Sequence, residues 1–359
     1  MDPVEVVRRP RRTAAASWIG EGLPEVFSSS TGVVLLKILS LLPLMLVGWL
    51  AARRGWAGRD TVAAASRFTV DLALPALTFT QLLRTVTPET LRAQWFLPIA
   101  GAGVMILAWL AGVAMAPLFG ARGRWATFVF LVTICNSVYL PLPIAQALYG
   151  DDGVRAVLLF NVGMVVVQWT LGIGTLLGRP EWRTMRDLAL SPGLLATAAA
   201  IAAALAVPAL RTLEGLDPRG AAPAALAGSA LLQALSLLGT LTIPLALLVT
   251  GARLDAGGTA REGRLSLPLG GVLFSRLLLA PAVTGVVMLL AAADGFRLDE
   301  VSRRIIFLIA CAPVAINCGV FTERYGGDSS LAAGAIFSST LLSVASVPAL
   351  FFVAELAGL

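Results

Sequence analysis

Long apolar runs separated by short polar connections dominate the hydropathy pattern from about residue 33 onward. Each run is long enough to cross a hydrocarbon core of about 30 Å as a helix, which takes about 20 residues. The pattern therefore predicts an all-α polytopic membrane protein. Its ten expected transmembrane segments are 33–52, 62–83, 95–119, 125–149, 154–177, 193–210, 224–248, 267–292, 305–321 and 331–355.

The fourth and ninth runs are each interrupted by residues that disfavour an unbroken helix. These residues are, in chain order, Asn136, Pro141, Pro143, Pro313, Asn317 and Gly319. Proline removes a backbone donor and clashes with the preceding turn, so the helix should open at both places. Unpaired backbone groups in hydrocarbon cost several kcal/mol each unless they line a cavity or bind a ligand. Two broken helices in corresponding halves of a polytopic chain are typical of a secondary transporter.

Prolines recur at nearly equal separations in the two halves, which indicates an internal repeat. The matching pairs are Pro43 with Pro208, Pro75 with Pro244, and Pro143 with Pro313. A repeat with an odd number of spans enters the membrane in opposite directions in its two copies, so we expect a 5+5 inverted repeat. The expected organisation is a mobile N-terminal tail at 1–29, a first five-helix repeat at 30–178, a polar connecting loop at 179–190 and a second five-helix repeat at 191–359.

The composition supports membrane insertion. Hydrophobic residues make up 57% of the chain and charged residues 13%, against roughly 25% charged in an ordinary soluble domain. The formal charge of +6 comes almost wholly from arginine, since Lys37 is the only lysine, and this usage is typical of a high-GC bacterial sequence. We therefore expect a bacterial cytoplasmic membrane protein. The arginines are scattered through short loops, which fits membrane topology better than nucleic-acid binding. When the N-terminal tail is left out, the number of arginines in the loops on each side of the membrane favours termini on the outside.

The chain contains no histidine. This excludes hydrolases that use an imidazole base, His-ligated haem and nearly all zinc sites. Cys135, Cys311 and Cys318 lie inside apolar runs without CxxC spacing, so we expect them to be packing residues. The chain also lacks the GxxxxGK[ST] loop of an ATPase subunit. We expect no enzymatic activity, no cofactor and no metal site.

Three motifs follow one another along the chain. They include the runs Asn136-Ser-Val-Tyr-Leu-Pro141-Leu-Pro143, Thr242-Ile-Pro244-Leu-Ala-Leu and Ala312-Pro313-Val-Ala-Ile-Asn317. Together they resemble the auxin efflux carrier family of permeases, within the bile acid/auxin transporter-like superfamily, and the similarity covers the chain from about residue 33 onward. One departure is Pro141, which stands where the family usually has glycine.

The resemblance implies a ten-helix fold in which broken segments four and nine cross at the membrane midplane. It also implies transport of small organic anions by alternating access. Scaffold segments one, two, six and seven would stay separate from a moving group made of the others, as in an elevator.

The two breaks supply the candidate substrate site. Asn136 and Asn317 offer amide donors for the oxygens of an anion, and the helix amino ends beside them offer positive potential. Alternatively, each asparagine satisfies carbonyls that its proline has freed. Gln168, which the resemblance places near the site, could equally make an interhelical hydrogen bond. We assign Pro141, Pro143, Pro313 and Gly319 to the shape of the breaks.

Ionisable residues at membrane depth are the remaining candidates, because each costs about 2.5 to 3.5 kcal/mol on insertion scales. Arg67 and Asp71 are four residues apart on segment two and are expected to neutralise each other, with Asp71 kept as a candidate carboxylate for proton coupling. Arg276 in segment eight either attracts an anion near the site or snorkels toward the headgroups. Coupling to Na⁺, coupling to H⁺ and uniport all stay open.

The sequence thus favours a secondary active transporter, of the permease or efflux-carrier kind, that moves a small organic anion such as a carboxylate. The alternatives are a sodium- or proton-coupled symporter of a bile-acid-like or other organic solute, and a non-transporting membrane sensor. The expected partners are the organic anion and the lipid bilayer, with a homodimer as an open option and no nucleic acid.

Overall fold

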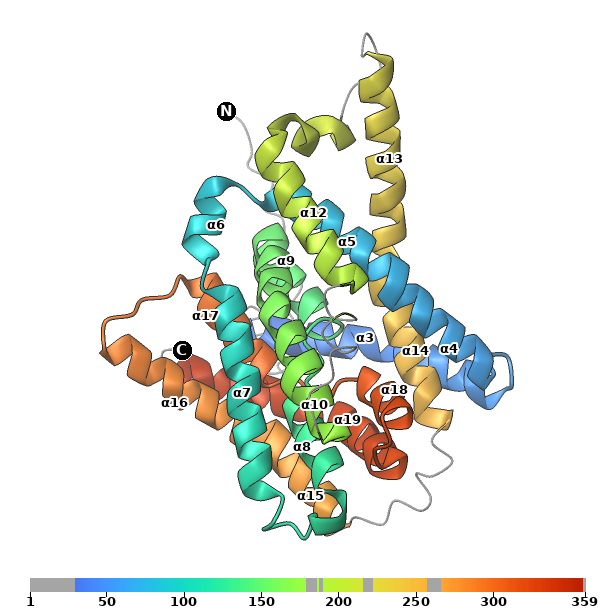
Figure 1. Cartoon of the computed structure of the whole chain (residues 1–359), viewed down its shortest axis with the longest axis vertical. Coiled ribbons are helices and arrows are strands. Elements are labelled where there is room, and N and C mark those ends of the chain that lie inside the picture. The colour runs from blue at the N-terminus through green and yellow to red at the C-terminus, as the bar shows by residue number, and fades with distance from the viewer. Residues whose placement is uncertain (1–29, 179–185, 187–189, 216–221, 257–265, 358–359) are drawn as a thin grey trace, which may run out of the picture.

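Helices account for nearly all of the computed structural model, which describes residues 30–178, 186, 190–215, 222–256 and 266–357 (Figure 1). The predicted tail at 1–29 and most of the predicted connecting loop lie outside these residues. The part of the chain that is described holds no strand beyond one isolated bridge. The α-helices are α3 (Ser30–Arg53), α4 (Arg59–Phe68), α5 (Leu74–Thr85), α6 (Pro88–Gln94), α7 (Leu97–Met115), α8 (Trp125–Thr133), α9 (Pro141–Val167), α10 (Ile173–Leu177), α12 (Pro192–Ala206), α13 (Pro223–Thr240), α14 (Thr242–Ala256), α15 (Leu267–Phe274), α16 (Ala280–Ala293), α17 (Glu300–Ala310), α18 (Asn317–Arg324) and α19 (Ser329–Leu356).

Short turns of other helix types join several of these elements. Three π-helical turns, η2 (Thr69–Ala73), η4 (Gln168–Gly172) and η7 (Ser275–Leu279), lie within longer helices, and η3 (Arg122–Arg124) and η5 (Pro208–Gly215) are 3₁₀ turns. Single π turns inside α-helices are frequent at functional sites, because they redirect the side chains that they carry.

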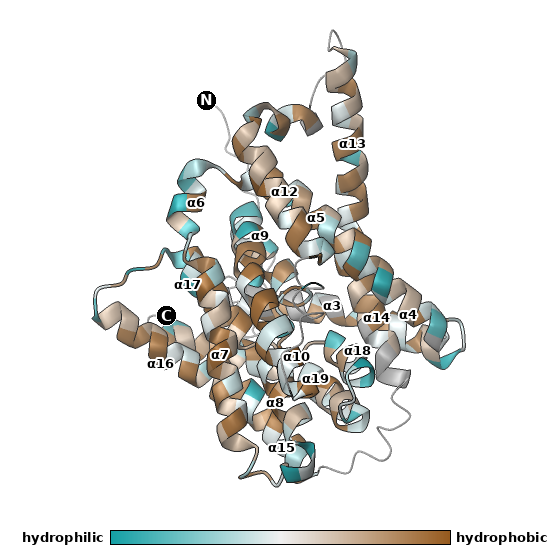
Figure 2. Cartoon of the chain, in the orientation of Figure 1, coloured by the Kyte–Doolittle hydropathy of each residue, from teal (hydrophilic) through white to brown (hydrophobic). Residues whose placement is uncertain are grey.

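Six helical stretches of the described chain are long and apolar enough to cross a membrane. They are Asp60–Thr85, Pro88–Met115, Pro141–Leu177, Pro223–Val249, Leu267–Ala293 and Ser329–Leu356. Leu42–Arg53 and Pro192–Ala206 are shorter apolar helices, and the predicted fourth and ninth segments are divided into half-helices. The protein is thus a multi-pass, all-helical membrane protein, whose polar residues gather at the start of α4, in α6 and in the η3 turn before α8 (Figure 2).

The fourth and ninth segments break where their prolines, asparagines and glycines predict. In the fourth, α8 ends at Thr133 and α9 begins at Pro141; in the ninth, α17 ends at Ala310 and α18 begins at Asn317. Proline is favoured at the first helical position because its missing N–H would have no partner there. Pro141 therefore begins a half-helix at the end of the break.

The second half of segment four runs directly into segment five within α9. Gly150 divides the two parts, with φ 56° and ψ −141°. A positive φ of this kind is readily adopted only by glycine, which has no Cβ. The chain can therefore reverse here without a long loop.

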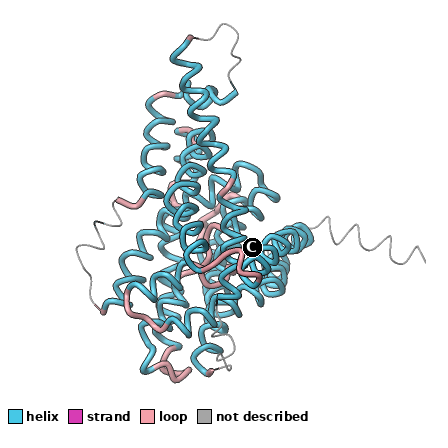
Figure 3. The backbone as a smooth tube through the Cα atoms, turned by 90° about the vertical axis from the view of Figure 1, so that its right-hand side faces the viewer, coloured by secondary structure: helices cyan, strands magenta, loops and turns pink. Residues whose placement is uncertain are grey.

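The helices pack as two groups. In one, α3 lies against α14, and α5 lies against α12 and α13; in the other, α7, α8, α9, α15, α16, α17, α18 and α19 pack among themselves. The two groups meet where α3 contacts α9 and α19 and where α5 contacts α9. Figure 1 shows α5, α12 and α13 together at one end of the molecule, and Figure 3 shows the same bundle from the side. Close approach of helices within each group depends on glycine. A Cβ on Gly251 of α14 would lie 1.7 Å from the Met45 carbonyl oxygen of α3. A Cβ on Gly163 of α9 would lie 1.7 Å from the Pro98 carbonyl oxygen of α7. Small residues at such contacts are typical of helix packing in membranes.

Candidate functional site

The two breaks are paired with each other through their backbones. The Asn136 N–H donates to the Pro313 carbonyl at 2.8 Å, and the Ala315 N–H donates to the Ile134 carbonyl at 3.0 Å. These bonds flank an antiparallel bridge between Cys135 and Val314. Four backbone groups that the breaks leave without a helical partner are therefore paired with the other break, as the absence of water from a membrane interior demands.

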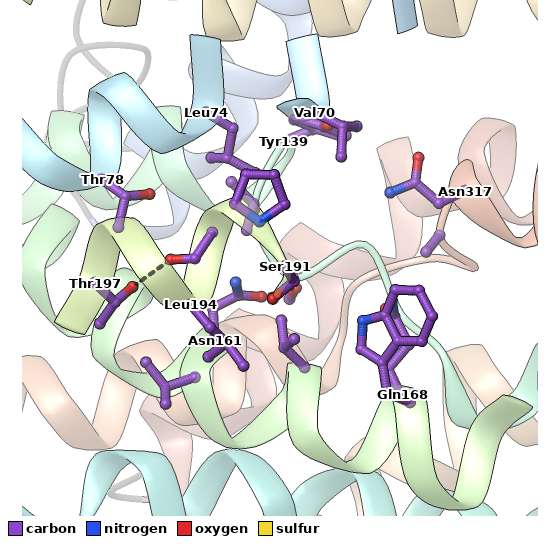
Figure 4. Close-up of a pocket in the computed structure, with 18 of the residues that line it drawn as sticks. Val70, Leu74, Thr78, Tyr139, Asn161, Gln168, Ser191, Leu194, Thr197 and Asn317 are labelled. Carbon is purple, nitrogen blue, oxygen red and sulfur yellow. Dashed lines mark hydrogen bonds between the residues drawn. The ribbon is translucent and has the colours of Figure 1, made fainter. Parts of the chain in front are cut away.

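A cavity of about 450 Å³ lies beside the paired breaks (Figure 4). Its walls come from both helix groups: η2 and α5 with the start of α12 on one side, and α9, η4, α18 and the two breaks on the other. The cavity thus lies on the seam between the two groups. Its polar lining includes the amides of Asn136, Asn161, Gln168 and Asn317.

Asn136 takes part in the break and also faces the cavity. Its Oδ1 accepts a hydrogen bond from the Tyr139 N–H at 3.1 Å. The other half of the amide, the Nδ2 donor group, makes no hydrogen bond to any residue that the structure describes. The Asn136 side chain therefore satisfies a backbone N–H, and not a carbonyl as the alternative from the sequence expects, while the residue also lines the cavity.

Asn317 and Gln168 also line the cavity, and their side chains make no hydrogen bond within the described chain. Asn317 is the first residue of α18, and Gln168 is the first residue of the π turn η4. Figure 4 shows Asn317 and Thr197 on opposite sides of the cavity. The structure thus brings together the three residues that the sequence nominates for substrate binding.

Three further polar side chains of the lining are Ser137, Ser191 and Thr197. Ser137 donates to Asn161 Oδ1 at 2.8 Å, and Thr197 on α12 donates to the Gly193 carbonyl at 2.8 Å. Ser191, the N-cap residue of α12, places the amino end of that helix at the cavity. The sequence holds a signal for this helix start in Ser191-Pro192, because serine at the N-cap and proline at the first helical position are both favoured. It holds no signal that α12 would reach the breaks.

Only one of the two charged candidates of segment two belongs to the cavity wall. Asp71 is exposed and lines the cavity, whereas Arg67 is exposed but lies outside the lining. The expected pairing of the two is wrong: no ion pair joins them, and both belong to the part of the chain that is described. Asp71 lies in the π turn η2, and the extra residue of a π turn changes the angular offset that would bring side chains four apart together.

Arg324, which the sequence does not nominate, is exposed at the end of α18 and lines the cavity. Its guanidinium lies 5.5 Å from the Tyr325 ring centroid. The nearby aromatic wall is formed by Phe321 and Trp169, whose rings meet edge to face at 5.8 Å. Asp71 and Arg324 thus place one negative and one positive group on the lining.

Of the two places expected for Arg276, the structure contradicts the headgroup region, whereas the residue does lie near the breaks that border the cavity. It is 0% exposed, so it does not snorkel, and it is not part of the cavity wall. Its guanidinium donates to the carbonyl oxygens of Val132, Ala310 and Ala312. Arg276 therefore contacts the carboxyl ends of the half-helices that precede the two breaks.

The residues assigned to the breaks lie at different points of them. Pro313 is in the second break and accepts from Asn136, whereas Pro141 and Pro143 are the first and third residues of α9. Gly319 is the third residue of α18, past the break, where a Cβ would meet Ile336 only at an ordinary distance of 3.6 Å. Among the described residues, no group of His, Cys, Asp and Glu could hold a metal ion.

Comparison with known proteins agrees with this arrangement. The model of a family described as "Membrane transport protein" matches residues 33–189 and 184–351. A protein from Methanothermobacter thermautotrophicus named "Uncharacterized transporter" is 24% identical over 330 residues, which cover 90% of this chain and 98% of that protein. A protein from Rhizobium meliloti named "Putative malonate transporter" is 25% identical over 333 residues, covering 88% of this chain and 94% of that protein.

The multi-pass helical fold and these matches define a membrane transporter and not an enzyme. The chain belongs to the auxin efflux carrier family of membrane transport proteins. The family that the break motifs resemble is thereby confirmed.

Proposed function

We propose that this protein is a secondary active transporter that moves a small organic anion of the carboxylate class across the membrane by alternating access. Substrate binds where segments four and nine cross, in the cavity beside their paired breaks. The observation that carries the proposal is the position of this cavity, on the seam between two helix groups and lined by donors from both broken segments.

An anion suits the electrostatics of the cavity. The amino ends of α12 and α18 both reach its wall, and each such end carries about half a positive elementary charge with free N–H groups. The unpaired Nδ2 of Asn136 and the side chains of Asn317 and Gln168 add donors without adding a buried charge. Arg324 adds positive potential at the rim. A small dicarboxylate such as malonate, the solute in the name of one relative, is of a suitable class.

The packing supports an inverted repeat of five plus five segments. The first segment, α3, packs on α14 of the seventh, and the sixth, α12, packs on α5 of the second. This reciprocal contact is the pattern that a two-fold axis in the membrane plane would produce. We propose ten spans on this basis, with the crossing half-helices of segments four and nine at corresponding places in the two copies.

Alternating access would follow from relative movement of the two groups. Segments one, two, six and seven would form the scaffold, and the other six would carry the paired breaks past it. Asn136 and Asn317 belong to the moving group, whereas Asp71 and Ser191 belong to the scaffold. A substrate held by the breaks would then meet a different part of the scaffold wall at each side of the membrane.

Asp71 favours a coupled version of this mechanism. It is an exposed carboxylate on the cavity wall with no ion-pair partner among the described residues. Such a group could take up a proton, or help to bind Na⁺, when the substrate binds. A sodium- or proton-coupled symporter of another organic solute is therefore the second candidate. We place either carrier in the cytoplasmic membrane of a bacterium, and we leave a homodimer open.

Counterflow in proteoliposomes tests the proposal. Vesicles are loaded with one unlabelled carboxylate from a panel that includes malonate, and uptake of the labelled compound is followed with and without Na⁺ at two pH values. We expect saturable, trans-stimulated exchange for at least one small carboxylate. Binding without exchange would instead indicate a membrane sensor, and no exchange for any carboxylate by folded protein would refute the organic-anion proposal.

A further inference from the structure

Arg276 is a fully buried cation, and its hydrogen-bond partners in the described chain are all backbone carbonyl oxygens. It is the largest fully buried side chain of the described chain, and no described carboxylate forms an ion pair with it. A charged side chain at membrane depth is costly unless it is paired or meets backbone carbonyls. The position of Arg276 within the π turn η7 therefore calls for a specific role.

The three carbonyls that it binds come from both broken segments. Nε donates to the Ala312 oxygen at 3.1 Å, one Nη donates to the Val132 oxygen at 3.2 Å, and the other donates to the Ala310 oxygen. Val132 lies in the last turn of α8, and Ala310 ends α17. Carbonyls in the last turn of a helix have no intrahelical partner and carry the negative end of the helix dipole, about half an elementary charge. One guanidinium thus balances two negative helix ends.

The same atoms fix the geometry of the crossing. The breaks are joined by the Asn136 to Pro313 and Ala315 to Ile134 bonds, and Ser339 of α19 accepts from the Val314 N–H at 3.1 Å. Arg276 adds a link from segment eight to both breaks at once. A planar guanidinium with donors in a fixed fork suits this task better than an ammonium, which is a point charge on a flexible stem.

We infer that Arg276 is a positioning residue that holds the two breaks in register and balances their negative ends. The positive potential at the amino ends of α9 and α18 is then not cancelled. The amino end of α18 and the amides of Asn136 and Asn317 face the cavity together. The part of this inference that concerns anion binding rests on the proposed function. The part that concerns the breaks does not.

The three cysteines of the chain give a readout of the breaks that needs no substrate. Cys135 lies in the first break, Cys311 in the second and Cys318 in the first turn of α18, and they are 3%, 0% and 0% exposed. Since the chain has only these thiols, total labelling by N-ethylmaleimide reports on the crossing. Arg155 of α9 provides a matched control, because it is also buried but binds Gln94, Thr85 and Asp152 away from the breaks.

The experiment compares Arg276→Gln, Arg276→Lys and Arg155→Gln with the wild-type chain in proteoliposomes. We expect Arg276→Gln to label at least tenfold faster, Arg276→Lys to label at an intermediate rate, and Arg155→Gln to stay within twofold of the wild type. Circular dichroism confirms that each protein is folded. Wild-type labelling rates in folded Arg276→Gln would overturn the inference; should that variant fail to fold, wild-type rates in Arg276→Lys would do the same.

Transport of labelled malonate separates positioning from general stability. A purely structural role would lower the amount of active protein and leave the KM of the surviving fraction unchanged. A positioning role predicts that folded Arg276→Lys has a KM raised at least threefold, while Arg155→Gln keeps the wild-type KM. A wild-type KM in Arg276→Lys would overturn the link to the substrate site. If the wild-type chain does not move malonate, the proposed function fails for that solute, and the labelling rates still decide the role of Arg276 at the breaks.

Discussion

Replacement of Asn317 by alanine should weaken substrate binding while leaving the fold intact. The Asn317 side chain lines the cavity and makes no hydrogen bond within the described chain, so its removal leaves no protein group unpaired. Alanine at the first position of α18 is also a better helix former than asparagine. The loss should therefore appear in transport and not in stability.

The expected size follows from the bond that is lost. A hydrogen bond to a charged group contributes about 1.5–3 kcal/mol, and each 1.4 kcal/mol is tenfold in affinity. The KM for malonate in Asn317→Ala should thus rise about 10- to 100-fold, with a melting temperature within about 2 °C of the wild type. Asn136→Ala should show a similar rise in KM together with a clear fall in melting temperature, because it also deprives the Tyr139 N–H of its acceptor. Leaving that donor unpaired costs about 1–3 kcal/mol.

The assay measures initial rates of malonate counterflow over a range of concentrations, with melting temperatures of the same preparations in detergent. Gln233→Ala is the matched control, because Gln233 is an exposed amide on α13 that does not line the cavity. It should keep the wild-type KM. A wild-type KM in folded Asn317→Ala would show that Asn317 does not contact the anion.

Three further predictions concern packing and charge. Gly163→Ala should lower the melting temperature, because its Cβ would lie 1.7 Å from the Pro98 carbonyl oxygen and overpacking costs about 1–3 kcal/mol. Gly174→Ala is the control and should leave the melting temperature unchanged, because nothing lies within 4 Å of the added Cβ. Equal melting temperatures in the two variants would contradict the packing. If uptake by the wild-type chain responds to an imposed proton gradient, Asp71→Asn should abolish that response while counterflow persists, and a retained response would exclude Asp71 as the coupling carboxylate. Arg324→Gln should raise KM less than about tenfold, because an exposed charge is screened, and should remove the dependence of KM on ionic strength; a variant that keeps this dependence would show that Arg324 is not its source.

The breaks could be predicted from sequence because the effect of proline is local. Pro313 removes a donor from its own helix, and Pro141 sets the first turn of α9, whatever the rest of the fold does. The family followed from the same motifs. The pairing of the breaks with each other came only through that resemblance, since backbone bonds between Asn136 and Pro313 join residues that are far apart in the chain.

The charged residues show where sequence reasoning ends. The rule that residues four apart share a helix face failed for Arg67 and Asp71, because it assumes an α-helix and η2 is a π turn. The partners of Arg276 are main-chain carbonyls, which no side-chain pattern can reveal. Likewise, Ser191 marks a helix start in the sequence, but its place at the cavity depends on how α12 packs on α5.

The most direct test of alternating access at this cavity is the accessibility of a thiol placed on its wall. Val165 of α9 lines the cavity, so the Val165→Cys variant is treated with a membrane-impermeant thiol reagent from either side of oriented vesicles. The wild-type chain, with its three buried cysteines, sets the background. We predict modification from both sides, slowed on both by malonate. Modification from one side only, unaffected by malonate, would contradict a substrate site that opens alternately to the two sides.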